Sequence, residues 1–420
     1  MAKRPLNVTI VGAGLAGLAT AISLALETAD LPESDRPSIK ILESVPSLNV
    51  PGAGLQVTPN ATRLLSRWGL LDRVEAVCAE PKRLVVHRYD GFPFIDVHRG
   101  DLQSLLYERA VELGVKVEWR QRVRNVRFDS LTLSSSQEGP FVHITTESGS
   151  SYATDILIGA DGIWSKCREL LLGHPDAPQP TGDLAYRIIL TLEDLGTDEE
   201  LLKLVKNPEA HFWTGPGAHC VGYSVRAGAS RMYNLVLLCP DDLPDDVARQ
   251  VGEVSEMKQL FEGWDPILLR FLEKVKKVDK WKLMHRPEME RWGANSALED
   301  GAVLGWCLGK VALAGESSSV QEEKSRGEKI KRAVELYERV RKVRGEQVAK
   351  ETFLQRHQFH MPDGPEQQER DRIFASQLGK DEIDDSIRFP SRWTCGIAQR
   401  WLYGYDAYAA VENAFRDRPL

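Results

Sequence analysis

The sequence predicts an α/β protein with a parallel sheet, a second sheet that is mixed or antiparallel, and a helical C-terminal region. Three observations support this prediction. A strand, a glycine-rich turn and a helix follow one another over residues 8–27. Strand-like runs alternate with turns from 181 to about 278, and apolar residues recur at helical spacing from 296 onward. The first of these segments is the most specific.

The glycine-rich turn follows the apolar strand run at 8–11 and has the spacing GxGxxG, with Gly12, Gly14 and Gly17. The first glycine allows a sharp turn, the second lets the backbone approach a pyrophosphate, and the third lets the helix lie against the strand. The helix N-terminus offers unpaired N–H groups to phosphates. The segment therefore predicts a dinucleotide site in a Rossmann-like domain, with a plain glycine-rich turn as the alternative.

The next strand supports this interpretation. After a loop at 29–38, the strand at 39–42 ends at Glu43. An acidic residue at the end of the second strand accepts hydrogen bonds from a ribose 2′-OH. A carboxylate here favours a cofactor without a 2′-phosphate, FAD or NAD rather than NADP. The alternative is a solvated glutamate at a strand end.

Two amphipathic helices are expected next. After a turn at 51–54, Asn60 is expected to cap the first helix and Gly69 to end it. After a strand at 84–87, Arg99 lies where the second helix begins. An arginine at that position either binds a phosphate or is an ordinary surface residue, and its spacing fits both interpretations equally.

Further strands follow. The runs at 115–119, 123–128 and 142–146 alternate as antiparallel strands do. Residues 155–160 form a short apolar run, as expected of a parallel strand that is buried on both faces. That strand ends in the turn Asp161-Gly162, where a carboxylate can reach a ribose or sugar-phosphate hydroxyl.

A different pattern begins at residue 181. We expect a separate antiparallel sheet with a helix near 253–262. The predicted strands lie at 185–190, 211–213, 219–225 and 233–238. Residues 325–350 combine mixed charge with apolar residues at helical spacing, which is typical of a solvated helix.

Composition limits the functional class. Of the 420 residues, 42% are hydrophobic and 27% are charged, and the net charge is −7. This balance does not favour nucleic-acid binding, and no apolar run is long enough to span a membrane. The six cysteines are scattered without a CxxC pair, which argues against a metal site and fits a reducing compartment. We expect a soluble cytoplasmic protein that acts on a small molecule.

Several motifs together resemble the FAD-dependent aromatic monooxygenases, and most closely their fungal salicylate-hydroxylase-like branch. The resemblance covers nearly the whole chain in consistent order. The matching stretches are VGAGLAGLA at 11–19, GAGLQVTPNATRLL at 52–65, HRGDLQSLL at 98–106, ILIGADGIWSKCRE at 156–169, GANSALEDGAVLG at 293–305, MPDGPEQQERD at 361–371 and WLYGYDA at 401–407.

The resemblance implies an enzyme in which NADPH or NADH reduces FAD, O2 is the oxidant, and a phenolic or other electron-rich aromatic small molecule is hydroxylated. It also suggests fungal secondary metabolism. The matching motifs assign to the ADP part of FAD the residues Gly12, Gly14, Gly17 and Glu43. They assign to the rest of the cofactor site Ala53, Gly54, Arg99, Asp161, Gly162 and Ala294.

The same resemblance implies a catalytic pair, Arg187 in AYRIIL and Tyr223 in CVGYSV. Flavin-dependent hydroxylation is electrophilic, so an aromatic ring is more reactive as a phenolate. A fixed guanidinium stabilises that anion, and a phenol can donate, accept or relay its proton. Without the resemblance, a surface ion pair for Arg187 and a half-buried sheet position for Tyr223 would be the simpler interpretation.

Motif order divides the chain into four regions. They are an FAD-binding domain at 1–180, a substrate-binding sheet domain at 181–286, a second part of the FAD-binding domain at 287–345 and a helical C-terminal region at 346–420. The connection before HRGDL is shorter here than in the family.

A larger departure lies at Trp292-Gly293. In relatives a strand, a Gly-Asp turn and an Ala-His-Pro segment lie at this junction. The strand completes the FAD sheet, and the aspartate binds the flavin's ribityl chain and pyrophosphate region. The alternative to an active hydroxylase is therefore a defective or truncated paralogue, or an incomplete gene model, that binds FAD or an aromatic ligand weakly without turnover. A nicotinamide-only dehydrogenase is disfavoured, because Asp161-Gly162 and the turn at 52–54 would then have no role.

Overall fold

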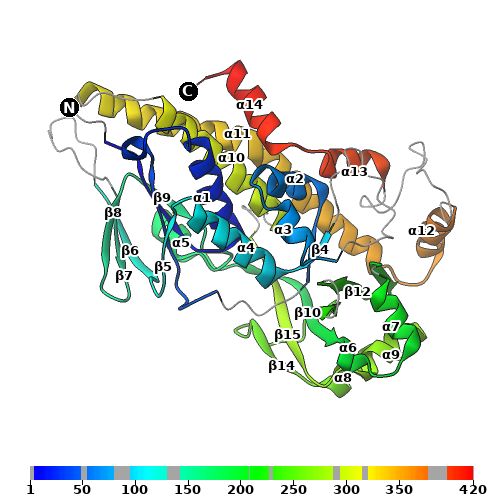
Figure 1. Ribbon diagram of the computed structural model, residues 1–420. Helices are drawn as coiled ribbons and strands as arrows, with labels where there is room; N and C mark the ends of the chain where they lie inside the picture. The colour runs from blue at the N-terminus through cyan, green and yellow to red at the C-terminus, as the bar shows by residue number, and fades with distance from the viewer. Residues whose placement is uncertain are drawn as a thin grey trace.

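The structure is a computed structural model that describes residues 4–48, 54–79, 95–129, 142–207, 209–226, 230–286, 294–314, 320–376 and 395–419. It confirms the predicted fold class, because a parallel sheet and antiparallel sheets are combined with a helical C-terminal region. Figure 1 shows two bodies, one formed mainly by the blue and cyan N-terminal elements and the other by the green central elements. The long helix α11 (Val320–Phe359) runs past both.

The first body centres on a parallel sheet with the strand order β5-β2-β1-β9. Its strands are β1 (Asn7–Val11), β2 (Ser38–Leu42), β5 (Lys116–Glu118) and β9 (Ile156–Gly159). The expectation of an antiparallel strand at 115–119 is wrong, because β5 pairs in parallel with β2. β5 directly follows helix α4 (Arg99–Glu112). A strand that is connected to its sheet through a crossover helix pairs in parallel.

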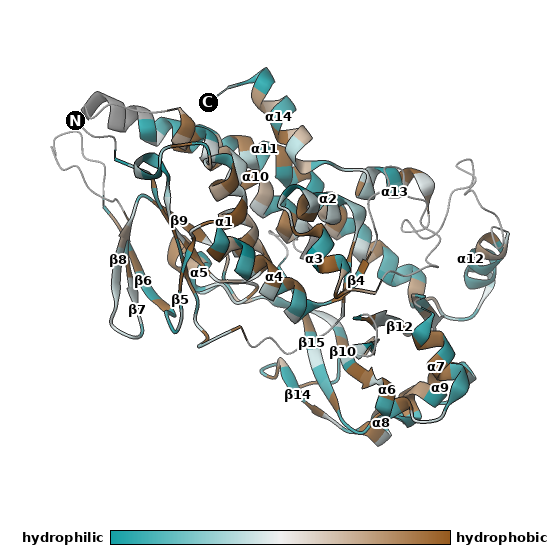
Figure 2. Ribbon diagram, in the orientation of Figure 1, coloured by the Kyte–Doolittle hydropathy of each residue, from teal (hydrophilic) through white to brown (hydrophobic). Residues whose placement is uncertain are grey.

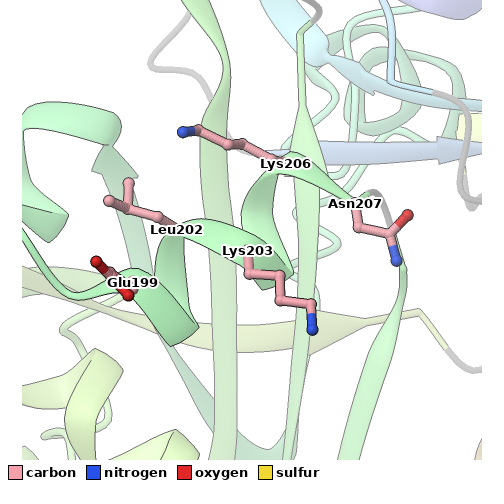
Figure 3. Close-up of a pocket in the computed structure, with 5 residues that line it drawn as sticks. All are labelled: Glu199, Leu202, Lys203, Lys206 and Asn207. Carbon is pink, nitrogen blue, oxygen red and sulfur yellow. The ribbon is translucent and has the colours of Figure 1, made fainter.

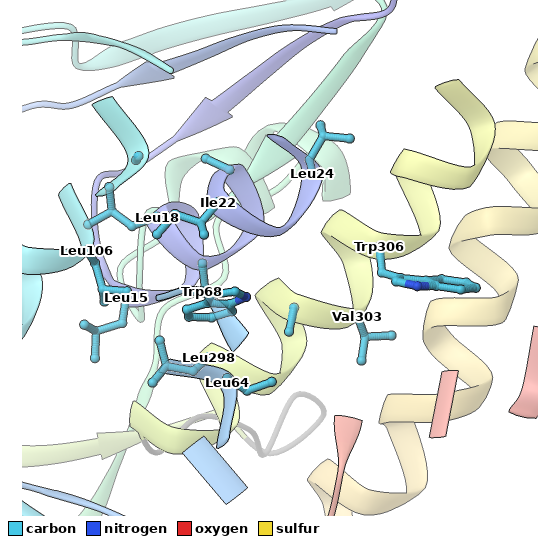
Figure 4. Close-up of a cluster of buried hydrophobic side chains, with 14 of the residues drawn as sticks. Leu15, Leu18, Ile22, Leu24, Leu64, Trp68, Leu106, Leu298, Val303 and Trp306 are labelled. Atoms are coloured by element: carbon cyan, nitrogen blue, oxygen red, sulfur yellow. The ribbon is translucent and has the colours of Figure 1, made fainter. Parts of the chain in front are cut away.

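Helix α1 (Leu15–Glu27) packs against helix α10 (Ala294–Leu313). The two helices approach closely because α10 carries a glycine at every fourth position along the contact. A Cβ atom at Gly301 would lie 2.5 Å from that of Ala19, and one at Gly305 would lie 2.6 Å from that of Ser23. Figure 2 shows α1 as mainly hydrophobic. The surrounding core, drawn in Figure 4, includes Leu18, Ile22, Trp68, Leu298 and Trp306.

Smaller elements complete the first body. They are the 3-10 helix η1 (Glu33–Asp35), the strands β3 (Gly54–Val57) and β4 (Ile95–His98), the helices α2 (Pro59–Arg67), α3 (Leu71–Glu75) and α5 (Lys166–Leu172), and the strands β6 (Val123–Phe128), β7 (Val142–Thr146) and β8 (Ser151–Thr154). β3 and β4 form a two-stranded antiparallel ribbon. The strand predicted at 84–87 lies outside the described residues.

Asn60 does not cap its helix as predicted. α2 begins at Pro59, and Thr58 occupies the N-cap position. Proline is favoured at the first helical position, which moves the cap back by two residues. The Asn60 side chain is buried instead, and its Nδ2 donates to Glu299 Oε1 at 2.7 Å. Gly69 follows the C-terminus of α2 and has a left-handed φ of +71°, which agrees with the prediction that it ends this helix.

The second body is a six-stranded antiparallel sheet with the order β11-β12-β13-β10-β15-β14. Its strands are β10 (Gln179–Thr191), β11 (His211–Gly215), β12 (Ala218–Val225), β13 (Met232–Pro240), β14 (Arg249–Gly252) and β15 (Val278–His285). One face packs against the helices α6 (Leu192–Leu195), α7 (Glu199–Lys206), α8 (Val254–Leu260) and α9 (Pro266–Glu273). The other face turns toward the first body.

Helix α11 continues unbroken past residue 345, and α12 (Pro365–Ala375), α13 (Gly396–Tyr403) and α14 (Ala407–Asp417) follow it. Buried ion pairs hold α11 against α10. Arg344 Nη2 lies 2.8 Å from Glu299 Oε1, and Arg341 Nε donates to Asp300 Oδ1 at 2.8 Å. Burial would raise the pKa of Glu299, but the two arginines outweigh burial and lower it.

Within the described ranges, no helix is long and apolar enough to cross a membrane. The same part of the chain holds no group of three or more His, Cys, Asp or Glu side chains placed to bind a metal ion.

Candidate active site

The glycine-rich turn between β1 and α1 has the geometry that its sequence predicts. Gly12 has φ +104°, and a Cβ atom there would lie 2.4 Å from the carbonyl oxygen of Ala160. A Cβ atom at Gly17 would lie 2.1 Å from the carbonyl oxygen of Gly12, so this close packing of α1 requires glycine. Apart from its chain neighbours, no atom of the described residues lies within 4 Å of a Cβ placed on Gly14, the N-cap of α1. This open space at a helix N-terminus suits a pyrophosphate.

Glu43 follows β2, and its carboxylate reaches the glycine-rich turn. Oε2 accepts a hydrogen bond from Ala13 N–H at 2.7 Å, and Oε1 accepts one from Val45 N–H at 3.0 Å. The side chain is half-buried. An acidic group therefore lies beside the turn and at the end of the second strand, where nucleotide-binding folds place the ribose contact. Together, the turn and this carboxylate fit the ADP part of FAD.

Sequence analysis missed Gln103, which supports the same turn. This residue lies in the first part of α4, and its Nε2 donates to the carbonyl oxygen of Ala13 at 2.7 Å. The side chain is buried, and its Oε1 has no partner within the described residues. The only sequence feature that could have identified Gln103 is its position in HRGDLQ, one helical turn after Arg99.

Gly54 brings the two bodies into contact. Its N–H donates to Asn234 Oδ1 at 2.9 Å, and a Cβ atom there would lie 2.6 Å from Cε2 of Tyr223. Any larger residue would therefore displace the tyrosine ring. Ala53, which was predicted to lie beside the flavin with Gly54, falls outside the described residues.

Arg187 and Tyr223 lie on the same face of the second sheet. Arg187 on β10 is aligned with Val236 on β13, and Tyr223 on β12 is aligned with Asn234 on β13. Residues two apart along a strand share a face, so these four side chains point the same way. Because Gly54 touches Tyr223 and Asn234, that face is the one turned toward β3.

Arg99 and Arg187 bring positive charge to this region. Burial lowers the pKa of both guanidinium groups, and the charge of Arg99 lowers the pKa of Arg187 further. Neither arginine forms an ion pair with any acid that the structure describes. Arg187 lies over the ring of Trp281, 5.3 Å from its centroid. Arg187 is half-buried and Arg99 is exposed at the start of α4. Two neighbouring cations without a carboxylate partner among the described residues favour an anionic ligand.

Tyr223 is only 5% exposed. Burial raises the pKa of its hydroxyl, and the charge of Arg187 opposes this shift only in part. The side chain is therefore a neutral phenol at physiological pH. A neutral phenol beside a guanidinium can donate a hydrogen bond to a bound anionic oxygen.

Asp96 on β4 is a second residue that sequence analysis missed. Its side chain is fully buried, and Oδ1 accepts a hydrogen bond from Gln56 Nε2 at 3.2 Å. Burial raises the pKa of this carboxyl well above its ordinary range, and the bond from Gln56 only partly opposes the shift. The sequence feature that could have identified Asp96 is its position as a single acid between two apolar residues in the strand run Ile95-Asp96-Val97.

Asp161 and Gly162 lie directly after β9, but Asp161 uses its carboxylate within the chain. Oδ2 accepts from the N–H groups of Lys166 and Cys167 at 2.8 and 3.0 Å, and Oδ1 accepts from Ser165 Oγ at 2.6 Å. The carboxylate thus helps to cap α5. Gly162 has φ +82° and open space around it. A role of this turn toward FAD stays a prediction, as does that of Ala294, the first residue of α10.

The prediction that β9 is buried on both faces is wrong. Among the described residues, β9 pairs only with β1. Its four residues are half-buried or exposed, whereas four of the five residues of β1 are buried. Just beyond it, Trp164 is 58% and Leu171 is 74% exposed.

A surface pocket on α7 is separate from these residues. Figure 3 shows the side chains that line it, which are Glu199, Leu202, Lys203, Lys206 and Asn207. α7 belongs to the helices that pack on the sheet face opposite Arg187 and Tyr223. We therefore assign this pocket no part in the site.

Sequence comparison gives related proteins over the whole chain. Residues 5–194 match a family model described as an FAD binding domain. The chain is 41% identical to the FAD-dependent monooxygenase OpS4 of Beauveria bassiana (strain ARSEF 2860), over 463 aligned residues that cover 100% of this chain and 99% of that protein. It is 25% identical to a 3-hydroxybenzoate 6-hydroxylase of Polaromonas naphthalenivorans (strain CJ2), with 96% of each chain covered. The first alignment is longer than the 420 residues of this chain, so OpS4 contains residues with no counterpart here.

Solved structures share the fold. CtdE in complex with FAD and its substrate 4 superposes with a TM-score of 0.71 at 20% identity, and 98% of each chain is covered. A salicylate hydroxylase substrate complex gives a TM-score of 0.68 at 19% identity, again with 98% of each chain covered. At this identity the likeness concerns the fold alone.

Proposed function

This chain belongs to the FAD-dependent monooxygenases, and from that premise we propose that it uses NAD(P)H and O2 to hydroxylate a phenolic or other electron-rich aromatic small molecule. The observation that carries the proposal is the position of Arg187 and Tyr223. The two side chains share the sheet face that turns toward the first body, and Gly54 of that body touches Tyr223. A cation and a neutral phenol are thus available to one aromatic ligand.

The described residues fit the ADP part of FAD. We propose that Gly14 and the N-terminus of α1 bind the pyrophosphate and that Glu43 binds the adenosine ribose. Gly54 and Arg99 then border the flavin, on the side where β3 meets the second sheet. When bound and reduced, FAD supplies the O2 chemistry, while the protein supplies binding, orientation and electrostatics.

The chain's own residues favour an ionised substrate. Arg187 neutralises a phenolate oxygen, and Arg99 adds positive potential nearby. Tyr223, which burial keeps neutral, donates a hydrogen bond to the same oxygen. Preorganised donors and charges of this kind act strongly in a site that excludes water, and an electron-rich phenolate ring is the more reactive form.

A second candidate is a protein that binds FAD or an aromatic ligand weakly and does not turn over. The observation that favours it is the unpaired edge of β9 among the described residues, together with an alignment to OpS4 that is longer than this chain. A direct comparison uses the segment-restored chain, defined here as this sequence with a strand, a Gly-Asp turn and their connections inserted between Trp292 and Gly293.

The biological setting completes the proposal. We propose a role in fungal secondary metabolism, with the protein acting in the cytoplasm. The fungal setting rests on the fungal relative at 41% identity and on the family resemblance of the motifs. The compartment rests on the six scattered cysteines without a CxxC pair, which fit a reducing environment.

The experiment that tests the proposal is Arg187→Ala, made in this chain and in the segment-restored chain. Each protein is supplied with FAD, NAD(P)H and a panel of phenols and hydroxybenzoates, and both product and NAD(P)H consumption are measured. Loss of one preorganised charge should lower product formation by about 100-fold or more, while flavin binding is kept and NAD(P)H oxidation continues uncoupled.

Arg249→Ala is the matched control. Arg249 also lies over the ring of Trp281, 4.4 Å from its centroid, but it sits on the edge strand β14 and is exposed. Full hydroxylation by the Arg187 variant, or an equal loss in the Arg249 variant, would overturn the assignment. Flavin binding without product from either unaltered chain would favour the second candidate.

A further inference from the structure

Asp96 differs from every other buried acid in the described residues. The buried carboxyl groups are those of Asp96, Asp155, Asp183, Glu299 and Asp300. Four of these five pair with an arginine, namely Asp155 with Arg4, Asp183 with Arg356, Glu299 with Arg341 and Arg344, and Asp300 with Arg341. The only partner that the described part of the chain gives the Asp96 carboxyl is the neutral amide of Gln56.

Among the residues that the structure describes, none provides a countercharge to Asp96. Its backbone pairs with Ala79, Oδ1 accepts from Gln56, and Oδ2 has no hydrogen-bond partner in the described ranges. The phenol of Tyr223 from β12 lies on the sheet face that is turned toward this ribbon, whereas Tyr233 from β13 points to the opposite, helix-covered face. A fully buried carboxylate without a cation is strongly disfavoured, so this group holds its proton.

Asp96 also lies on the side of the ribbon that meets Tyr223. In the β3–β4 ribbon, Gln56 is aligned with Asp96 and Gly54 with His98. Residues two apart on a strand share a face, so Asp96 and Gly54 belong to one face. Gly54 lies against the ring of Tyr223. The tyrosine therefore has a carboxyl group on its ribbon side and Arg187 on its sheet side.

We propose that Asp96 is a positioning residue that acts through Tyr223. It remains a neutral carboxylic acid, and its proton on Oδ2, which no described group accepts in this structure, is available to the Tyr223 hydroxyl oxygen when that phenol donates its own proton toward an anionic substrate oxygen beside Arg187. Asp96 neither gains nor loses a proton in this role. Its neutrality leaves the positive charge of Arg187 and Arg99 available to the substrate, because an ionised Asp96 would cancel part of it. The inference rests on the proposed function of Arg187 and Tyr223.

The protonation state can be measured on this chain without flavin or substrate. Infrared difference spectra of the chain and its Asp96→Asn variant at pH 7 should contain the carbonyl band of a protonated carboxylic acid, which the variant lacks. A difference spectrum that contains only carboxylate bands would overturn the proposal. This measurement does not depend on the activity of the protein.

Action through Tyr223 is tested with 4-nitrophenol, a phenol whose ionisation is visible in its absorbance. Asp96→Leu keeps the size of the side chain and removes the donor, whereas Asp96→Asn keeps a donor that cannot titrate. We expect the pKa of the bound nitrophenol to rise by about one unit, a tenfold loss of phenolate stabilisation, in the leucine variant. The asparagine variant should stay close to the unaltered chain.

Two results would contradict this mechanism. The first is an asparagine variant as impaired as the leucine variant, which would mean that a carboxylate is required. The second is an undiminished effect of Asp96→Leu in a Tyr223→Phe background, which would mean that Asp96 acts independently of the tyrosine. Arg187→Ala serves as the comparison, because an unchanged nitrophenol pKa in that variant would refute the proposed function and not the role of Asp96.

Discussion

Glu43 offers a direct test of the cofactor site. Its two carboxylate oxygens accept hydrogen bonds from Ala13 and Val45 at 2.7 and 3.0 Å, so the side chain is already oriented beside the glycine-rich turn. Glu43→Ala would lose these two internal hydrogen bonds in both the free and the FAD-bound protein. The free-energy cost of losing them therefore largely cancels when FAD affinities are compared. What remains is the hydrogen bond from the ribose to a charged acceptor, which contributes about 1.5–3 kcal/mol. We therefore expect FAD to bind about 10- to 150-fold more weakly.

Flavin fluorescence during titration with FAD measures this change in both the chain and the segment-restored chain. Glu43→Gln should have a smaller effect, because its amide oxygen can still accept a hydrogen bond without the charge. Glu33→Ala is the control for net charge, because Glu33 lies exposed in η1. Equal FAD affinity in the Glu43→Ala variant and the Glu33→Ala control would remove Glu43 from the site and refute the reasoning.

Two further predictions concern stability. Burial, with help from His360, lowers the pKa of His219 from 6.5 to about 3. Between these values the unfolded chain binds the proton that the folded chain does not, so stability should fall by about 2 kcal/mol as the pH drops from 6.5 to 5. Urea unfolding at both pH values should show that the free energy of unfolding falls less in His219→Gln than in the unaltered chain. An equal fall in the two proteins would contradict the assignment of this pH dependence to His219. Arg341→Met leaves the buried acids Glu299 and Asp300 less compensated and should lower the free energy of unfolding by about 3–5 kcal/mol. The same substitution at Arg339 is the control, and equal effects of the two would contradict a special role for Arg341.

Local spacing explains which parts of the fold could be predicted. The strand, glycine turn and helix at the N-terminus depend on neighbouring residues, and Glu43 follows directly from the end of the second strand. The alternation of apolar residues also predicts the strands that carry Arg187 and Tyr223. Their common face then follows from the register of β10 and β12 with β13.

The features that were missed depend on contacts between distant segments. Asparagine is a residue type that often caps helices, but the partner of the Asn60 side chain, Glu299, lies 239 residues away. Gln103 and Asp96 are ordinary polar residues until packing buries them beside Ala13 and Tyr223. The direction of β5 is likewise set by its crossover from α4, since a run of only a few alternating residues does not encode whether a strand pairs in parallel.

The visible absorbance spectrum of purified protein, with and without added FAD, tests the account most directly. β9 pairs on one side only in the described structure, and an open strand edge beside the exposed side chains of Trp164 and Leu171 favours aggregation. We predict that this chain is poorly soluble or is isolated without flavin absorbance. The segment-restored chain, with roughly two dozen residues added for one strand and its connections, should bind FAD in equimolar amount and hydroxylate an aromatic substrate. Equimolar FAD and hydroxylation by the 420-residue chain as it stands would contradict the account.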